Sequence, residues 1–176
     1  MEKTFIFAGF GGQGMLLIGK FVAMACMLDG KHVSWLPSYG PEMRGGTANC
    51  SVCLSDDPIG SPLVVTPDAL VAMNQPSLDK FVDKVREGGI IVADSTLVPN
   101  IPDVPGVKIV AIPATEIAEK NGLKGLGNIV LIGKLFEETG FCREETLEAA
   151  ITKCVPARHI KKLPLNMQAV ELGRKA

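Results

Sequence analysis

Near its start, at residues 4–28, the chain reads TFIFAGFGGQGMLLIGKFVAMACML. Thr4 to Ala8 form a short apolar run that predicts a strand, and Met15 to Leu28 are dense in Leu, Met and Ala, which predicts a buried helix. Between them, residues 9–14 are Gly-Phe-Gly-Gly-Gln-Gly and match the pattern G-x-G-x-x-G. A strand, a glycine loop and a helix in this order predict an α/β fold.

The glycine loop stands where an anion site needs it. Glycines allow a tight turn and close approach of a ligand, and the free amides and dipole at a helix N-terminus favour negative charge. We expect a phosphate group as the ligand of this loop. The same glycines would also serve a tight strand-to-helix crossover without any ligand, and the sequence leaves both readings open.

A dinucleotide site of the usual kind also needs a carboxylate at the end of the second strand, to hold the ribose hydroxyls. Here that end reads Trp-Leu-Pro-Ser-Tyr at residues 35–39, with no carboxylate, and Asp29 lies before the strand. The loop also lacks the Gly-Lys-Ser/Thr ending of a P-loop. NAD binding in the usual pose and an ATPase are both disfavoured.

The remaining chain alternates between strand and helix patterns. His32 to Leu36 predicts a strand that Pro37 stops, and Ser77 is expected to cap a helix that runs to Arg86. Further strands are predicted at 47–54, 69–73, 89–93 and 108–112, and further helices at 115–120, 128–138 with Asn128 as cap, 143–153 and 165–173. Apolar strands interleaved with helices predict a mostly parallel sheet with helices on both faces.

Composition limits the function classes. A length of 176 residues, 47% hydrophobic and 21% charged, predicts a single globular domain over residues 1–176. The net charge of −1, with no basic stripe, argues against nucleic acid. The longest apolar stretch is too short to span a membrane and the N-terminus does not match a signal peptide, so we expect a cytoplasmic protein.

Cysteine and histidine usage gives no metal site. Five cysteines without framework spacing suit a reducing compartment. Cys50 and Cys53 form a lone C-x-x-C in a predicted strand, where positions three apart point to opposite faces, so we expect two buried strand cysteines.

A second loop, residues 38–46, reads Ser-Tyr-Gly-Pro-Glu-Met-Arg-Gly-Gly. Because it follows the second strand, we expect it near the same carboxyl edge as the glycine loop, and the two could share a crevice. Arg44 could offer a bidentate fork to a carboxylate or phosphate, with Glu42 orienting it. A turn with a local Glu42–Arg44 pair is the alternative.

These two loops together give a specific resemblance. GFGGQG at 9–14 and YGPEMRGGTANCSV at 39–52 resemble the gamma subunits of 2-oxoacid:ferredoxin oxidoreductases, which include the pyruvate, 2-oxoisovalerate and 2-oxoglutarate enzymes. DDPIGSP at 56–62 and GLGNIVLIG at 125–133 are also similar to this family. The resemblance covers nearly the whole chain and implies a Rossmann-like fold.

The resemblance also implies membership of a complex that oxidatively decarboxylates a 2-oxoacid with coenzyme A, giving acyl-CoA and reduced ferredoxin. The PEMRGG form looks more like the 2-oxoglutarate and 2-oxoisovalerate branches, and 2-oxoglutarate is the expected substrate. Thiamine diphosphate and iron–sulfur clusters are expected on partner subunits, named alpha and beta, with a delta subunit as a further candidate. The chain itself lacks the thiamine diphosphate motif and the closely spaced cysteines of a cluster, so the isolated chain is expected to be inactive.

Coenzyme A is the candidate ligand of this chain, and no residue is assigned a catalytic role. The candidate cofactor-binding residues come from the two loops: Gly9, Gly11, Gly12, Gln13, Gly14, Tyr39, Glu42, Arg44, Gly45 and Gly46. Two alternatives remain: a free-standing Rossmann-like nucleotide-binding module or NAD(P)-dependent oxidoreductase, and a purely structural module.

Overall fold

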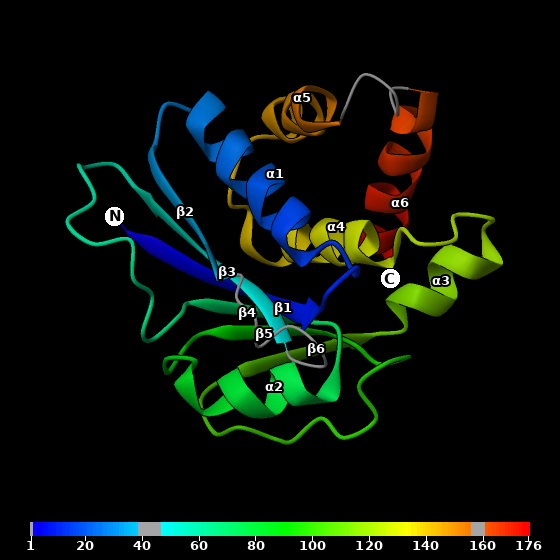
Figure 1. The fold of residues 1–176 in the computed structure, drawn as a ribbon, viewed down its shortest axis with the longest axis horizontal. Coiled ribbons are helices and arrows are strands. Elements are labelled where there is room, and N and C mark those ends of the chain that lie inside the picture. Colours follow the sequence, from blue (N-terminus) through cyan, green and yellow to red (C-terminus); the bar gives the residue numbers. More distant parts are fainter. Residues whose placement is uncertain (1, 39–46, 156–160) are drawn as a thin grey trace.

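A computed structural model of the chain describes residues 2–38, 47–155 and 161–176, and the elements follow one another as an α/β domain (Figure 1). The strands are β1 (Lys3–Phe10), β2 (His32–Ser38), β3 (Thr47–Ser55), β4 (Ala69–Ala72), β5 (Ile90–Asp94) and β6 (Lys108–Ile112). The helices are α1 (Met15–Leu28), α2 (Gln75–Phe81), the 3₁₀ turn η2 (Val82–Lys84), α3 (Ala114–Lys120), α4 (Gly127–Thr139), α5 (Glu144–Cys154) and α6 (Leu163–Lys175).

The six strands form one mixed sheet in the order β2-β3-β1-β4-β5-β6. Strands β1, β4, β5 and β6 are parallel, whereas β3 is antiparallel to both of its neighbours, β1 and β2. Strand β2 therefore runs in the same direction as β1. The predicted α/β class with a mostly parallel sheet is confirmed, but β3 lies between β1 and β2, the two strands that α1 connects.

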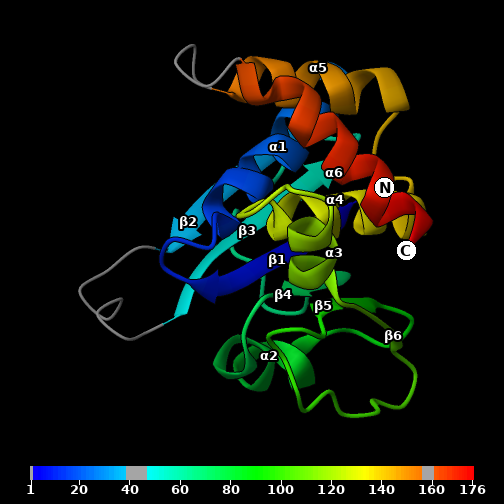
Figure 2. The same cartoon turned by 90° about the vertical axis from the view of Figure 1, so that its right-hand side faces the viewer.

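The two faces of the sheet carry cores of different size. Alternation along β1 sends Phe5 and Phe7 to the larger core, under α1, α4, α5 and α6, and Ile6 and Ala8 to the smaller core. The smaller core is covered by α2, η2 and the irregular segment after β5. Figures 1 and 2 show α2 on the opposite side of the sheet from α1, α4, α5 and α6.

The predicted cap of the second helix was wrong. The helix begins at Gln75, and Asn74 caps it, because the Asn74 Oδ1 accepts a hydrogen bond from the Ser77 backbone N–H at 2.7 Å. Pro76 occupies the first turn, where its fixed φ suits a helix start. The helix also ends early, at Phe81, and η2 continues it.

Two further boundaries differ from the prediction. Pro37 does not stop β2, which continues to Ser38, because β2 is an edge strand, where a residue without an N–H is tolerated. Asn128 is not the cap of α4: Leu126 holds that position and Asn128 lies in the first turn. Among the described residues, no helix is long and apolar enough to cross a membrane.

Candidate functional site

The glycine loop lies at the carboxyl edge of the sheet, between Phe10, the last residue of β1, and Met15, the first residue of α1. Phe10, Gly11 and Gly12 are exposed, so no side chain of the described residues closes over the tip of the loop. The predicted strand–loop–helix arrangement is therefore present.

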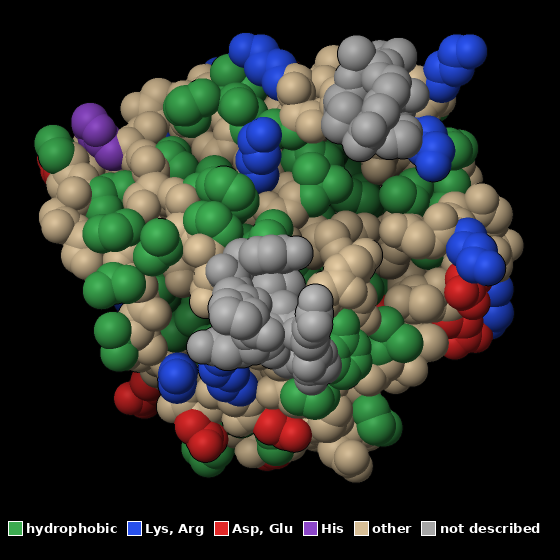
Figure 3. All heavy atoms as spheres, in the orientation of Figure 1, with side chains coloured by type: hydrophobic (Ala, Val, Ile, Leu, Met, Phe, Trp, Pro, Cys, Tyr) green, Lys and Arg blue, Asp and Glu red, His purple; other side chains and the backbone are tan. Residues whose placement is uncertain are grey.

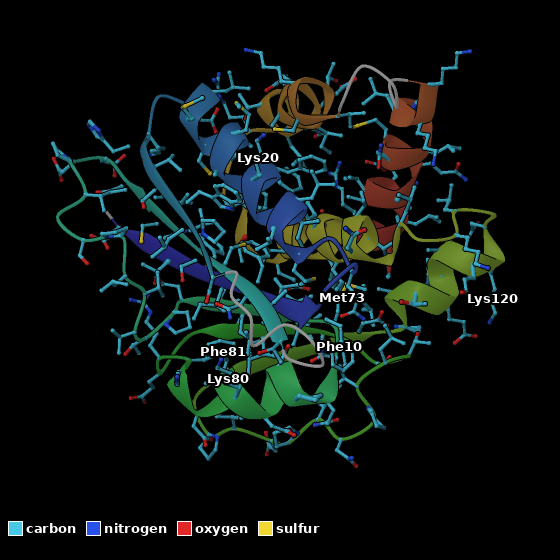
Figure 4. All side chains as sticks on the ribbon, viewed as in Figure 1. Phe10, Lys20, Met73, Lys80, Phe81 and Lys120 are labelled. Carbon is cyan, nitrogen blue, oxygen red and sulfur yellow. The ribbon has the colours of Figure 1, made fainter. Side chains whose placement is uncertain are left out.

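Gln13 fastens this loop to the neighbouring strand. Its Oε1 accepts a hydrogen bond from the Phe10 N–H at 2.6 Å, and its Nε2 donates to the Met73 carbonyl oxygen at 3.0 Å, just beyond β4. Figure 4 shows Phe10 and Met73 beside each other at this edge. Both ends of the Gln13 amide have partners within the protein, so this side chain positions the loop.

The glycines of the loop differ in what requires them. A Cβ at Gly9 would stand 2.6 Å from the Gln13 Oε1 and 2.8 Å from the Met15 Cγ, so close packing requires glycine there. Gly14 has a φ of 75° and a Cβ on it would collide with the Asn128 Nδ2. Gly12 has a φ of 94°, and among the described residues no heavy atom lies within 4 Å of its Cβ position. With respect to those residues, the backbone of Gly12 is open to a ligand.

The N-terminus of α1 completes the loop. Gly14 is the N-cap residue and offers no side-chain acceptor to the first amides, and the first turn contains no acidic residue. These amides and the positive end of the helix dipole face the carboxyl edge, which favours an anion there. Asn128, from α4, supports this turn by donating from its Nδ2 to the Gly14 carbonyl oxygen at 3.4 Å.

The second loop can be placed only by its two ends. Tyr39, Glu42, Arg44, Gly45 and Gly46 lie outside the described residues. Ser38 pairs with Asn49, which in turn pairs with Ala8, and Thr47 lies opposite Phe10. Both ends of the segment 39–46 are therefore at the edge that carries the glycine loop, as the direction of β2 predicted.

Asp94, at the end of β5, has a structural role. It is fully buried; its Oδ2 accepts from the Thr115 hydroxyl at 2.5 Å, and its Oδ1 accepts from the Thr96 N–H at 3.1 Å. The carboxylate thus joins β5 to the start of α3.

The two strand cysteines are buried on opposite sides of β3, as predicted. The Cys50 Sγ lies 3.5 Å from the Met15 carbonyl oxygen on the α1 side, and the Cys53 Sγ contacts the carbonyl oxygens of Ser61 and Pro62 on the other. Burial raises the pKa of the Cys50 thiol to about 12 and also raises the pKa of Cys53. Within the described ranges, no group of three or more His, Cys, Asp or Glu residues could hold a metal ion.

Two hollows at the opposite, amino edge of the sheet are lined by charges that already have partners. In a hollow of about 270 Å³, Arg86 pairs with Asp68 at 2.6 Å and Lys108 pairs with Glu138 at 2.5 Å. The neighbouring hollow, of about 260 Å³, contains the paired side chains of Lys31 and Asp56. The carboxyl edge is therefore the better candidate site.

Sequence reasoning missed the partners of the glycine loop. Met73 and Asn128 hold the loop from β4 and α4, yet they lie 60 and 114 residues from the residues they contact. No local pattern signals such contacts, because they depend on the order of the strands and on the packing of α4 beside α1.

The fold and the loop define a Rossmann-like α/β domain whose accessible backbone lies at the carboxyl edge of a mixed sheet. The chain belongs to the pyruvate ferredoxin/flavodoxin oxidoreductase family, whose model matches residues 4–176. The resemblance inferred from the two loops is confirmed.

Two similar relatives differ in how much of their own length the chain covers. The chain is 45% identical to the ketoisovalerate oxidoreductase subunit VorA of Methanothermobacter thermautotrophicus over 168 residues, 94% of this chain and 34% of VorA. It is 41% identical to the 2-oxoglutarate synthase subunit KorC of Methanocaldococcus jannaschii over 160 residues, 89% of this chain and 85% of KorC. The chain thus spans about a third of the length of VorA but most of KorC.

Solved structures with the same fold include the gamma subunit of a keto/oxoacid ferredoxin oxidoreductase from Geobacter sulfurreducens, at 32% identity and a TM-score of 0.84, covering 98% of this chain and 96% of that chain. A second is the 2-oxoglutarate:ferredoxin oxidoreductase of Magnetococcus marinus, with 2-oxoglutarate, coenzyme A and succinyl-CoA bound. Its identity is 27% and its TM-score 0.86, covering 99% of this chain and 30% of that chain.

Proposed function

We propose that this protein is the gamma subunit of a complex that oxidatively decarboxylates a 2-oxoacid with coenzyme A and passes the electrons to ferredoxin. The observation that carries the proposal is the match to KorC and to the Geobacter gamma subunit along most of both chains in each pair. A free-standing NAD(P)-dependent oxidoreductase is not favoured, because β2 ends without the carboxylate that would hold the ribose.

The proposed substrate is 2-oxoglutarate, and ketoisovalerate is the competing substrate. VorA has the slightly higher identity, but the KorC subunits of several organisms and the Magnetococcus 2-oxoglutarate enzyme are also similar to this chain. The catalytic chemistry is assigned to partners: thiamine diphosphate and iron–sulfur clusters on alpha and beta subunits, with a delta subunit as a further candidate, would supply decarboxylation and electron transfer. The isolated chain is expected to be inactive.

The glycine loop is the proposed contribution of this chain to coenzyme A binding. Open space above Gly12 and the uncapped amides at the start of α1 suit the phosphates of that ligand. The Magnetococcus relative was solved with coenzyme A bound, which supports this ligand class. Arg44 is proposed as a second phosphate contact, with Glu42 orienting it, because both ends of its segment lie at the same edge.

Reconstitution tests the function directly. The chain is co-expressed with its candidate alpha and beta partners, and ferredoxin reduction is measured with coenzyme A and either 2-oxoglutarate or ketoisovalerate. We expect turnover by the complex, with the higher kcat/KM for 2-oxoglutarate, and none by the isolated chain. Turnover by the chain alone would contradict the proposal. A higher kcat/KM for ketoisovalerate would contradict 2-oxoglutarate as the substrate and make ketoisovalerate the substrate instead.

Gly12→Ala tests the loop in the same complex. The new Cβ adds a methyl group to the proposed phosphate contact and strains a left-handed backbone, and we expect the KM for coenzyme A to rise about tenfold, which corresponds to roughly 1.4 kcal/mol. Gly88→Ala is the matched control, since Gly88 also has a positive φ, of 76°, and an open Cβ position, but lies near the amino edge. Arg44→Ala should also raise the KM for coenzyme A. If neither Gly12→Ala nor Arg44→Ala changes this KM, the two loops do not contribute to coenzyme A binding.

A further inference from the structure

One flank of the molecule exposes apolar side chains from two segments that contain no charged residue. It consists of β2 (His32–Ser38) and the segment 58–67, which together we name the charge-free flank. Neither of these two described segments contains Asp, Glu, Lys or Arg, although 21% of the chain is charged. Figure 3 shows hydrophobic side chains gathered along the left side of the molecule, where β2 and the segment after β3 lie in Figure 1.

The segment 58–67 lies beside β3, on the face of the sheet that carries the smaller core, against which Val64 packs. The Cys53 Sγ, from β3, contacts the carbonyl oxygens of Ser61 and Pro62 at 3.9 Å each. An open hollow of about 280 Å³ is lined by residues of both β2 and the segment: His32, Val33, Ser34, Pro58, Ile59 and Pro62. The strand and the segment therefore border the same hollow.

The side chains on this flank are poorly buried by the chain itself. Val65 and Leu63 are 75% and 69% exposed, the highest values among the exposed large hydrophobic side chains of the described residues. Trp35 and Leu36, on opposite sides of β2, are 38% and 37% exposed. The core of a protein–protein interface is typically poor in charged residues and rich in aromatic and aliphatic ones, and these side chains have that composition.

The flank also includes the open edge of the sheet. Proteins usually protect such an edge with lysine, an inward-facing charge or proline, and of these β2 has only Pro37. Pro37 opposes the addition of a further strand, because it cannot donate to a ladder. Contact with a partner is therefore expected through side-chain packing against the flank and its hollow.

We propose that the charge-free flank is the docking surface for the large partner polypeptide, the one equivalent to the part of VorA that this chain does not match. This inference rests on the proposed function. The same region occupies only 34% of VorA and 30% of the Magnetococcus chain, so in those relatives the domain is joined to a polypeptide about twice its size. When such a neighbour covers an uncharged flank, no charged side chain of this flank has to be removed from water, so the cost in free energy is low. The partner surface is correspondingly apolar and free of charge.

The test compares two sets of variants in the complex. Leu63→Asp with Val65→Asp places two charges on the flank at exposed positions, where the fold should tolerate them. Leu165→Asp is the control: Leu165 is 40% exposed but lies in the first turn of α6, away from the flank, where an acidic residue suits the helix dipole. Thermal unfolding verifies that all variants fold.

Association with the large partner is measured by titration and size-exclusion chromatography. We expect the flank variant to weaken association at least about tenfold, and the control to leave it unchanged. Hydrogen exchange should show protection of residues 32–38 and 58–67 in the wild-type complex. Wild-type affinity in the flank variant, or no protection there, would overturn the docking surface while leaving the proposed function intact.

Two further outcomes distinguish a failure of the proposed docking surface from a failure of the proposed function. If the wild-type chain does not associate with the large partner at all, the proposed function falls together with this surface. If the flank variant abolishes only self-association of the chain and still binds the large partner, the flank is an interface between two copies and the proposal is overturned.

Discussion

At the scale of single residues, Gln13 connects the structure to the proposed ligand. Its amide makes two hydrogen bonds, to Phe10 and to Met73, that hold the glycine loop against β4. Gln13→Ala should destabilise the fold by about 1–3 kcal/mol, because the Phe10 N–H and the Met73 carbonyl lose their partners. It should also raise the KM for coenzyme A in the complex with little change in kcat, since a displaced loop affects binding before chemistry.

Gln75→Ala is the matched control for that prediction. The Gln75 amide also bridges two segments, with hydrogen bonds to the backbone of Asn100 in both directions, but it lies on the α2 side. Urea unfolding should give a similar loss of stability for both variants. The positioning role of Gln13 is contradicted if the two variants have the same KM for coenzyme A.

A second residue-scale prediction concerns the buried Cys50 thiol, whose pKa burial raises to about 12. In the unfolded chain a thiol titrates near 8.5, so between these two values the folded state holds a proton that the unfolded state loses. The stabilisation is complete below about pH 8.5 and is lost as pH rises towards 12, at up to about 1.4 kcal/mol per pH unit.

Cys50→Ala should therefore make the decline of unfolding free energy between about pH 9 and 10.5 shallower. Val52→Ala, two positions along the same buried face of β3, removes core volume without a titrating group and should lower the free energy of unfolding by the same amount at every pH. Equal pH slopes for the Cys50 variant and the wild type would contradict the assignment.

At the scale of elements, the sequence predicted what local patterns encode. The bounds of α1 and β6 match the prediction because an apolar run and its flanking glycines or prolines define both ends. The order of the strands was not encoded locally: nothing in residues 47–55 indicates that β3 inserts antiparallel between β1 and β2. Likewise Asn74, and not Ser77, caps α2, since the two residues are equally good caps and tertiary packing chooses between them.

The candidate site divides in the same way. The glycine pattern predicted the loop and its edge, and the direction of β2 predicted where the second loop begins and ends. The sequence could not show why individual glycines are needed, because the contacts responsible are visible only in the structure. Asn128 of α4 leaves no room for a Cβ at Gly14, and the Gln13 side chain leaves none at Gly9.

Helix α6 depends on two glycines for its approach to α4. A Cβ at Gly133 would collide with the Val170 backbone, and one at Gly173 with the Val130 backbone. Although alanine is the better helix former by about 1 kcal/mol, we expect Gly133→Ala and Gly173→Ala each to destabilise the fold by about 1–3 kcal/mol, because the two helices must separate. Urea unfolding measures this, with Glu148→Ala on the exposed side of α5 as a near-neutral control; a gain in stability in either glycine variant would contradict the close crossing.

At the scale of the whole molecule, the three surfaces have different compositions. The carboxyl edge presents glycine backbone, the amino edge presents paired charges, and the charge-free flank presents apolar side chains. This separation would allow ligand and partner to occupy different faces of one domain, so a variant on one face should leave the other function intact. The two experiments proposed for Gly12 and for Leu63 with Val65 test this independence when each variant is measured in both assays.

The unequal cores predict unequal stability across the molecule. Helices α1, α4, α5 and α6, together with Ala114 and Ala118 of α3, enclose the larger core, whereas α2, η2 and the irregular segment 95–107 cover the smaller one. Elements with less buried apolar area open at lower free energy. Amides of α2, and any hydrogen-bonded amides of residues 95–107, should therefore exchange by a partial unfolding that leaves α1 and α4 protected. Native-state hydrogen exchange at low denaturant measures the protection of both groups of amides. Leu78→Ala, in the smaller core, should lower protection mainly in residues 75–107, and Leu131→Ala, in the larger core, should lower it throughout the chain. Equal protection of α2 and α4 would mean that the two layers unfold as one cooperative unit.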